Sequence, residues 1–126
     1  SVASRGLGDV YKRQIVDCYS LCRDWYNREF GLNLGDYDRR DQFWLRAENL
    51  YLDNFANEGF YPIPLEELQY GDAILMQLQS PLPNHAAIYI GDQLILHHLQ
   101  GRLSSRDIYG GYYLKSTARC LRHESR

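Results

Sequence analysis

The sequence has little of what two classes of protein require. Its 126 residues carry 14 basic and 16 acidic side chains, a formal net charge of −2, so the basic excess of nucleic-acid-binding proteins is missing. No apolar run is long enough to cross a membrane, and no secretory signal is recognisable. We therefore expect neither a nucleic-acid partner nor a membrane partner.

Cysteine is also scarce, with Cys18, Cys22 and Cys120 as its only positions. An odd number without a repeated pair spacing argues against a disulfide framework and favours reduced thiols. Cys22 follows Cys18 by four residues, but the tight ligand pairs typical of structural zinc sites are missing. We expect no metal ion and no other cofactor.

What the sequence does contain begins with an amphipathic helix. Apolar residues spaced by three and four predict a helix from Cys18 to near Gly31, with Asp17 as its N-cap. The start of a helix favours negative charge and so activates a thiol. Cys18 is therefore a candidate nucleophile, and the alternative is a small buried apolar residue.

Two β-rich runs that flank residues 91–92 predict a β-hairpin. Because side chains alternate along a strand, the turn length decides which histidine of the return strand shares the face of His85. A two-residue turn would place His98 there, and a three-residue turn would place His97 there. The pattern alone leaves both alternatives open.

The length and the 44% hydrophobic content suit one core and one domain. Patterns and breakers predict the remaining elements. These are a second amphipathic helix from about Asp41 to Asn57, a short turn at Leu65 to Leu68, a strand from Ala73 to Leu78, a polar loop from Gly101 to Gly111 and a closing strand from Thr117 to Arg122.

Three motifs resemble the NlpC-type cysteine peptidases: Asp-Cys-Tyr-Ser-Leu at 17–21, Leu-Gln-Tyr-Gly-Asp at 68–72, and His-Ala-Ala-Ile-Tyr-Ile-Gly at 85–91, followed by His97. Residues 18–26 and 97–111 are similar to the branch found in tail-assembly proteins of lambda-like phages. The resemblance implies an α+β fold with a papain-like core. N-terminal helices would pack on an antiparallel sheet of about four to five strands.

The resemblance also implies the roles of the site residues. Cys18 would be the nucleophile, His85 its base and His97 the residue that orients the base, since the family spacing favours His97 over His98. The Cys18 sulfur and a nitrogen of His85 should then lie within about 4 Å.

Contacts to a substrate are expected from Tyr19, Ser20 and Asn84. The guanidinium group of Arg102 could bind a substrate carboxylate. Arg106 could do the same, and the alternative for both arginines is solvation or an ion pair with a nearby acid such as Asp107.

The implied activity is hydrolysis of an amide bond in the stem peptides of bacterial peptidoglycan. Other phage tail proteins would be partners, and the location would be the virion tail after synthesis in the host cytoplasm. One alternative is a catalytically silent structural tail-assembly protein with the same fold. Another is an acyltransferase.

Residues 4–14 resemble a translated transposon-end adapter from sequencing libraries. We therefore expect residues 1–14 to be a non-native segment of metagenomic origin that makes few apolar contacts. The NlpC-type domain would cover residues 15–126 and would be truncated at its N-terminus, which leaves the activity of this chain open.

Overall fold

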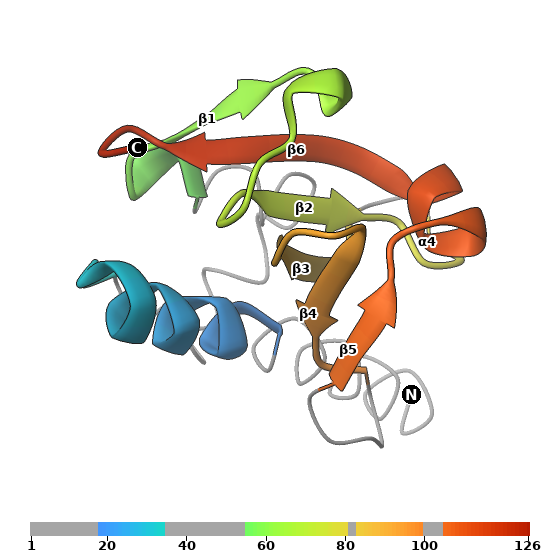
Figure 1. The fold of residues 1–126 in the computed structure, drawn as a ribbon, viewed down its shortest axis with the longest axis horizontal. Helices are drawn as coiled ribbons and strands as arrows, with labels where there is room; N and C mark the ends of the chain where they lie inside the picture. Colours follow the sequence, from blue (N-terminus) through green and yellow to red (C-terminus); the bar gives the residue numbers. More distant parts are fainter. Residues whose placement is uncertain (1–17, 35–54, 81–82, 100–104) are drawn as a thin grey trace, which may run out of the picture.

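The computed structural model describes residues 18–34, 55–80, 83–99 and 105–126. Residues 18–30 form a helix, and a second helix is described over residues 55–57. The described strands form one six-stranded antiparallel sheet in the order β1-β6-β2-β3-β4-β5 (Figure 1). The strands are β1 (Phe60–Ile63), β2 (Ala73–Met76), β3 (His85–Tyr89), β4 (Leu94–His97), β5 (Ser105–Ile108) and β6 (Thr117–His123), with a 3-10 turn η2 (Leu65–Glu67) and a short helix α4 (Gly111–Lys115).

The predicted α+β class is confirmed, and the expected strand number is corrected from four or five to six. The two edge strands, β1 and β5, were not predicted. Pro62 lies in β1, and proline is tolerated there because an edge strand has one unpaired side. β5 lies inside the segment predicted to be a polar loop, and its residues alternate between half-buried and exposed.

The helix at 18–30 packs against the sheet through the apolar side chains that the spacing predicted. The hydroxyl of Tyr26 donates to the backbone oxygen of Gly71 at 2.7 Å. Gly71 has a φ of +92°, and a Cβ there would lie 2.5 Å from the ring of Phe30. A glycine at this position lets the helix approach closely, and the first described turn of the helix then lies beside β4 (Figure 1).

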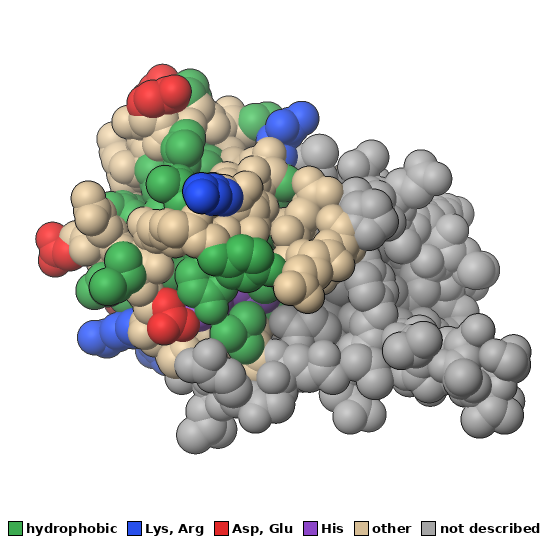
Figure 2. Space-filling model, turned by 90° about the vertical axis from the view of Figure 1, so that its right-hand side faces the viewer, with side chains coloured by type: hydrophobic (Ala, Val, Ile, Leu, Met, Phe, Trp, Pro, Cys, Tyr) green, Lys and Arg blue, Asp and Glu red, His purple; other side chains and the backbone are tan. Residues whose placement is uncertain are grey.

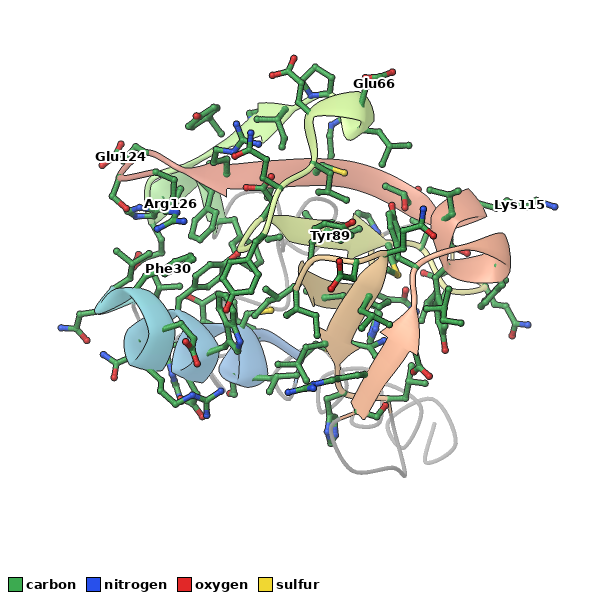
Figure 3. All side chains as sticks on the ribbon, in the orientation of Figure 1. Phe30, Glu66, Tyr89, Lys115, Glu124 and Arg126 are labelled. Atoms are coloured by element: carbon green, nitrogen blue, oxygen red, sulfur yellow. The ribbon has the colours of Figure 1, made fainter. Side chains whose placement is uncertain are left out.

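The far end of the helix is held by aromatic contacts and by the chain terminus. Trp25 meets Tyr26 and Phe30 edge to face, with ring centroids 5.3 Å and 5.1 Å apart. The guanidinium of Arg126 lies 3.9 Å from the centre of the Phe30 ring, and Figure 3 shows the two side chains together. Such contacts add to area burial by about 0.5–1.5 kcal/mol per aromatic pair.

A second apolar cluster contains side chains from β2, β3, β4 and β6 and is separate from the cluster that holds the helix. Its buried members are Ile74, Met76, Ala87, Ile95, Tyr109 and Cys120. Figure 2 shows the side of the molecule that carries α4 and β5, where further apolar side chains gather at the surface. The exposed members from this region are Ile108, Tyr112 and Leu114.

A partly buried ion pair joins β6 to the residue that precedes β2. The carboxylate of Asp72 accepts from Nε of Arg122 at 2.9 Å and from its terminal nitrogen at 2.8 Å. Arg122 also donates to the backbone oxygen of Glu67 at 2.7 Å, and Asp72 accepts from the backbone N–H of Gln69 at 2.8 Å. This cluster closes the turn that leads into the sheet.

The turn between β3 and β4 contains three residues, Gly91, Asp92 and Gln93, with φ values of 86°, 54° and 60°. The backbone N–H of Leu94 donates to the oxygen of Gly91 at 2.9 Å. Ala87 is therefore paired with His97. The three-residue alternative is confirmed, and the two-residue alternative is wrong.

Several predictions fall on residues outside the described ranges. They concern residues 1–14, the cap at Asp17, most of the helix from Asp41 to Asn57, and Arg102. Within the ranges that are described, no helix combines the length and apolar character needed to cross a membrane.

Candidate active site

The helix and β3 bring a thiol and an imidazole together. Sγ of Cys18 lies 3.1 Å from Nδ1 of His85, which confirms the predicted proximity. The thiol is also 3.2 Å from the backbone oxygen of His98, so a second acceptor is within reach of its hydrogen. Cys18 and His85 are both 0% exposed.

The other nitrogen of His85 meets His97. Nε2 of His85 and Nδ1 of His97 are 2.8 Å apart, and the two rings are tilted by 69°. Because Ala87 is directly opposite His97, His85 is its diagonal neighbour on the same face of the sheet. The predicted pairing of His85 with His97 rather than His98 is therefore confirmed as a contact.

The hydrogen-bonded chain continues to a residue that the sequence analysis did not propose for the site. Oδ2 of Asp107 lies 2.6 Å from Nε2 of His97 and 3.4 Å from Oγ of Ser105. Ser105 on β5 is directly opposite His97 on the adjacent β4, so Asp107 is the diagonal neighbour of His97. Ser105 and Asp107 lie on one face of β5 and Arg106 on the other, but the sequence Ser-Arg-Asp-Ile has no apolar run that would mark a strand.

Asp107 contacts a histidine of the site, and the roles proposed for Arg102 and Arg106 stay predictions. Arg106 points to the opposite face because adjacent strand residues alternate, and it is exposed. Tyr113 from α4 closes the site from another direction, since its ring lies edge-on to His97 with centroids 5.0 Å apart.

Burial controls the protonation of this cluster. Desolvation, followed by the nearby His97 and His98, lowers the pKa of His85 to about 3. The imidazole is therefore neutral near pH 7 and can accept a proton. Burial raises the pKa of Cys22, with a further contribution from Cys18, and burial raises the pKa of Cys120 to about 11.

The residues predicted to contact a substrate have varied surroundings. Tyr19 is 5% exposed and meets Phe55 edge to face at 5.6 Å, as a core aromatic does. Ser20 is half-buried on the helix. The Asn84 amide accepts from the N–H of Leu78 at 2.8 Å and donates to its oxygen at 3.1 Å, which closes the β2–β3 loop. Their roles in substrate binding stay predictions.

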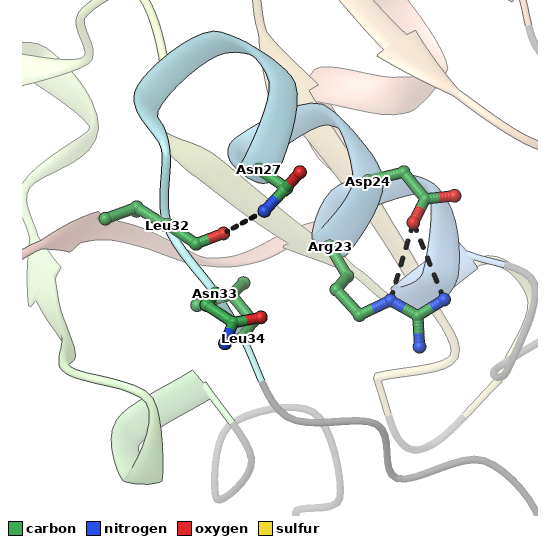
Figure 4. A pocket seen from close by; sticks show the side chains of 6 residues that line it. All are labelled: Arg23, Asp24, Asn27, Leu32, Asn33 and Leu34. Atoms are coloured by element: carbon green, nitrogen blue, oxygen red, sulfur yellow. Dashed lines mark hydrogen bonds and ion pairs between the residues drawn. The ribbon is translucent and has the colours of Figure 1, made fainter.

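A separate cavity lies beside the helix and the segment that follows it (Figure 4). Its volume is about 280 Å³, and it is lined by Arg23, Asp24, Asn27, Leu32, Asn33 and Leu34. None of the hydrogen-bonded groups of the site opens into it. Among the described residues, no group of three or more histidine, cysteine or acidic side chains is arranged to hold a metal ion.

A thiol, a neutral imidazole in contact with it and a second polar group on the imidazole form the arrangement that nucleophilic cysteine catalysis requires. The comparison with known proteins agrees with this class. The chain belongs to the NlpC/P60 family, whose sequence model matches residues 8–122. That match begins inside the segment predicted to be non-native, and the domain boundary at residue 15 stays a prediction.

Two relatives come from phages. The chain is 40% identical over 118 residues to the tail tip assembly protein K of Escherichia phage lambda, covering 94% of this chain and 59% of that protein. It is 38% identical over 132 residues to the tail tip assembly protein K of Escherichia phage N15, covering 98% of this chain and 53% of that protein. The chain thus spans little more than half the length of these relatives.

A solved structure supports the fold. An NlpC/P60 family protein from Bacillus cereus superposes with a TM-score of 0.61 at 21% sequence identity. The superposition covers 85% of this chain and 31% of that one. At this level of identity the likeness concerns the fold alone.

Proposed function

We propose that this chain hydrolyses an amide bond in the stem peptides of bacterial peptidoglycan, as a component of a phage tail. The observation that carries the proposal is the 3.1 Å approach of the Cys18 sulfur to a neutral imidazole nitrogen of His85. Membership of a family of the cysteine-peptidase type supports the reaction class. The names of the two phage relatives support the location and the other tail proteins as partners.

The first half of the reaction would form a thioester. Nδ1 of His85 takes the thiol proton of Cys18 while the sulfur attacks the carbonyl carbon of the substrate. The tetrahedral intermediate collapses when its C–N bond breaks and His85 returns the proton to the leaving amine. Backbone N–H groups in the first turn of the helix would stabilise the oxyanion.

The second half would release the acid. His85 takes a proton from a water molecule, whose oxygen attacks the thioester carbon, and the C–S bond then breaks. The proton returns to the sulfur of Cys18, so the enzyme is regenerated without any cofactor. His97 would hold the His85 ring in the orientation that both halves need.

Burial sets a condition on this chemistry. Cys18, His85 and His97 are each 0% exposed, so a substrate carbonyl reaches the sulfur only after neighbouring groups move apart. The same burial favours the second candidate, a structural tail protein that keeps the fold without turnover. The assembly role in the names of the relatives agrees with that candidate as well.

The test is to incubate the purified chain with peptidoglycan stem peptides and to follow fragments by mass spectrometry. Cys18→Ala and Cys18→Ser should lower the rate by at least about 10³-fold, because the nucleophile is removed. Cys120→Ala is the matched control, since it removes another buried cysteine and should leave the rate unchanged.

The possible results separate the candidates. A Cys18→Ala protein as active as its parent would exclude the mechanism. A folded parent that neither cleaves the peptides nor forms a covalent adduct with them would favour the structural candidate. Products in which an added amine replaces water would indicate acyl transfer.

A further inference from the structure

The four polar groups of the site form one continuous line. Cys18, His85, His97 and Asp107 are joined by contacts of 3.1 Å, 2.8 Å and 2.6 Å. The first three side chains are fully buried, whereas Asp107 is 31% exposed. The line therefore runs from a buried thiol to a carboxylate that is in contact with solvent.

We propose that Asp107 is a positioning residue that fixes which nitrogen of each histidine carries a proton, so that His85 presents a bare nitrogen to Cys18. The inference rests on the proposed function, because a bare nitrogen matters only if His85 acts as a base. It goes beyond that function by adding a fourth group, on a third strand, that acts through His97 and His85.

The direction of the line follows from what each group can do. A carboxylate only accepts hydrogen bonds, so Nε2 of His97 must carry the hydrogen that meets Asp107. In its neutral form His97 has one N–H, so its Nδ1 is bare and accepts from Nε2–H of His85. Nδ1 of His85 is then bare in turn and faces Sγ of Cys18. The Asp107 carboxylate thus determines whether Nδ1 of His85, two rings away, carries a hydrogen.

The opposite arrangement would block the reaction. If Nδ1 of His97 carried the hydrogen, it would donate to Nε2 of His85 and leave the hydrogen of that ring on Nδ1. The thiol would then face an N–H group, which cannot accept its proton. The contact distances would be unchanged, so spacing alone does not select the productive arrangement.

The sheet supplies the rigidity that this arrangement needs. His85, His97 and Asp107 lie on β3, β4 and β5, and each step crosses one antiparallel pair to a diagonal neighbour. Oγ of Ser105, directly opposite His97, is 3.4 Å from the same carboxylate oxygen. The edge-on ring of Tyr113 restricts the His97 ring from the side.

A positioning role and a purely structural role of Asp107 predict opposite orders for two variants. Asp107→Asn keeps the shape but adds an N–H donor, which selects the reversed arrangement in both rings. Asp107→Ala removes the group and lets water accept from Nε2 of His97. If Asp107 merely held β5 in place, the isosteric Asn would be the milder change.

The first experiment measures stem-peptide cleavage by the parent and three variants. In hydrolases with a Ser-His-Asp site, exchanging the carboxylate for an amide lowers kcat by about 10⁴-fold through the wrong tautomer. With one more ring in between, we expect a loss of about 10²-fold for Asp107→Asn, and about tenfold for Asp107→Ala. Asp92→Asn, in the exposed turn of the same hairpin, is the matched control and should match the parent.

The second experiment does not depend on activity. Nitrogen-15 NMR of the imidazole rings identifies the protonated nitrogen of each histidine. The parent should show a protonated Nε2 and a bare Nδ1 in both His85 and His97, and Asp107→Asn should move protons toward Nδ1. A parent with Nδ1 protonated in either ring overturns the inference, even if the Asn variant fails to fold.

The outcomes also separate this inference from the proposed function. If the parent cleaves but Asp107→Asn is as active as the parent, or if Ala is more harmful than Asn, the inference is wrong and the proposed function stands. If the parent does not cleave while its rings show the expected protonation, the proposed function fails and the role of Asp107 in ordering the rings stands.

Discussion

Asp72 and Asp107 each accept hydrogen bonds from a side chain on a strand of the same sheet, Asp72 from Arg122 of β6 and Asp107 from His97 of β4. Asp72 is 3% exposed and meets two guanidinium nitrogens, whereas Asp107 is 31% exposed and meets a ring nitrogen of His97 and the hydroxyl of Ser105. A guanidinium has only donors and stays charged. An imidazole can exchange its donor and acceptor atoms.

This difference separates a cluster that holds the fold from one that can move a proton. Every polar atom around Asp72 is fixed as either a donor or an acceptor. These contacts therefore stabilise the fold but cannot transfer a proton. The groups from Asp107 to Cys18 admit two opposite arrangements with the same distances, and only one of them makes His85 a base.

The largest effect is expected at the fixed cluster. Arg122→Met leaves the Asp72 carboxylate buried without its charged partner, which should lower the free energy of unfolding by about 3 kcal/mol. Denaturant unfolding followed by circular dichroism measures the loss. The control is Arg119→Met on the same strand, whose exposed guanidinium donates to the adjacent backbone oxygen of Ala118. Equal stabilities of the two variants would remove the contrast between the two clusters.

A smaller effect is expected when the proton-carrying cluster is titrated. The pKa of His85 is about 3 in the folded protein, and an unfolded histidine titrates near 6.5. Between these values the unfolded chain binds the proton and the folded chain does not, so stability falls as the pH falls. The loss from pH 6.5 to pH 4.5 should be about 2 kcal/mol for this group.

The assignment of that pH dependence can be checked by substitution. His85→Gln should flatten the stability profile between pH 4.5 and pH 6.5, because the titrating group is gone. His123 is outside the line of four groups and forms a hydrogen bond with the nearby Ser125. The control His123→Gln should therefore keep the slope of stability against pH. A parent profile without a slope in this range would contradict a neutral, buried His85.

The sequence predicted most of the site because its signals are local. The spacing of apolar residues after Cys18 predicted the helix, and alternation around the turn predicted the strands of His85 and His97. The turn length is set by three consecutive residues with positive φ, two of which are not glycine. The sequence pattern does not indicate this turn length, so only the family resemblance favoured His97 over His98.

The two edge strands are missed for a different reason. β1 contains a proline, and β5 has the sequence Ser-Arg-Asp-Ile, so neither shows an apolar run. Each of them is a strand because of its pairing. β1 pairs with β6, which is distant in the chain, and β5 pairs with β4. Asp107 could be recognised only with that pairing, because its register with Ile95 brings it diagonally to His97.

The smallest effect concerns the three cysteines, which burial alone does not separate. Cys18, Cys22 and Cys120 are 0%, 0% and 4% exposed, so a difference in reactivity must come from their neighbours. Burial raises the pKa values of Cys22 and Cys120, whereas Nδ1 of His85 lies 3.1 Å from the Cys18 sulfur and can take its proton while the sulfur attacks the reagent. With iodoacetamide near pH 6 and mass spectrometry of the peptides, we expect Cys18 to react at least about tenfold faster than the other two. His85→Gln should remove the faster alkylation of Cys18, and His123→Gln should keep it. Equal alkylation rates of the three cysteines in the parent would mean that His85, His97 and Asp107 leave Cys18 as unreactive as a structural thiol.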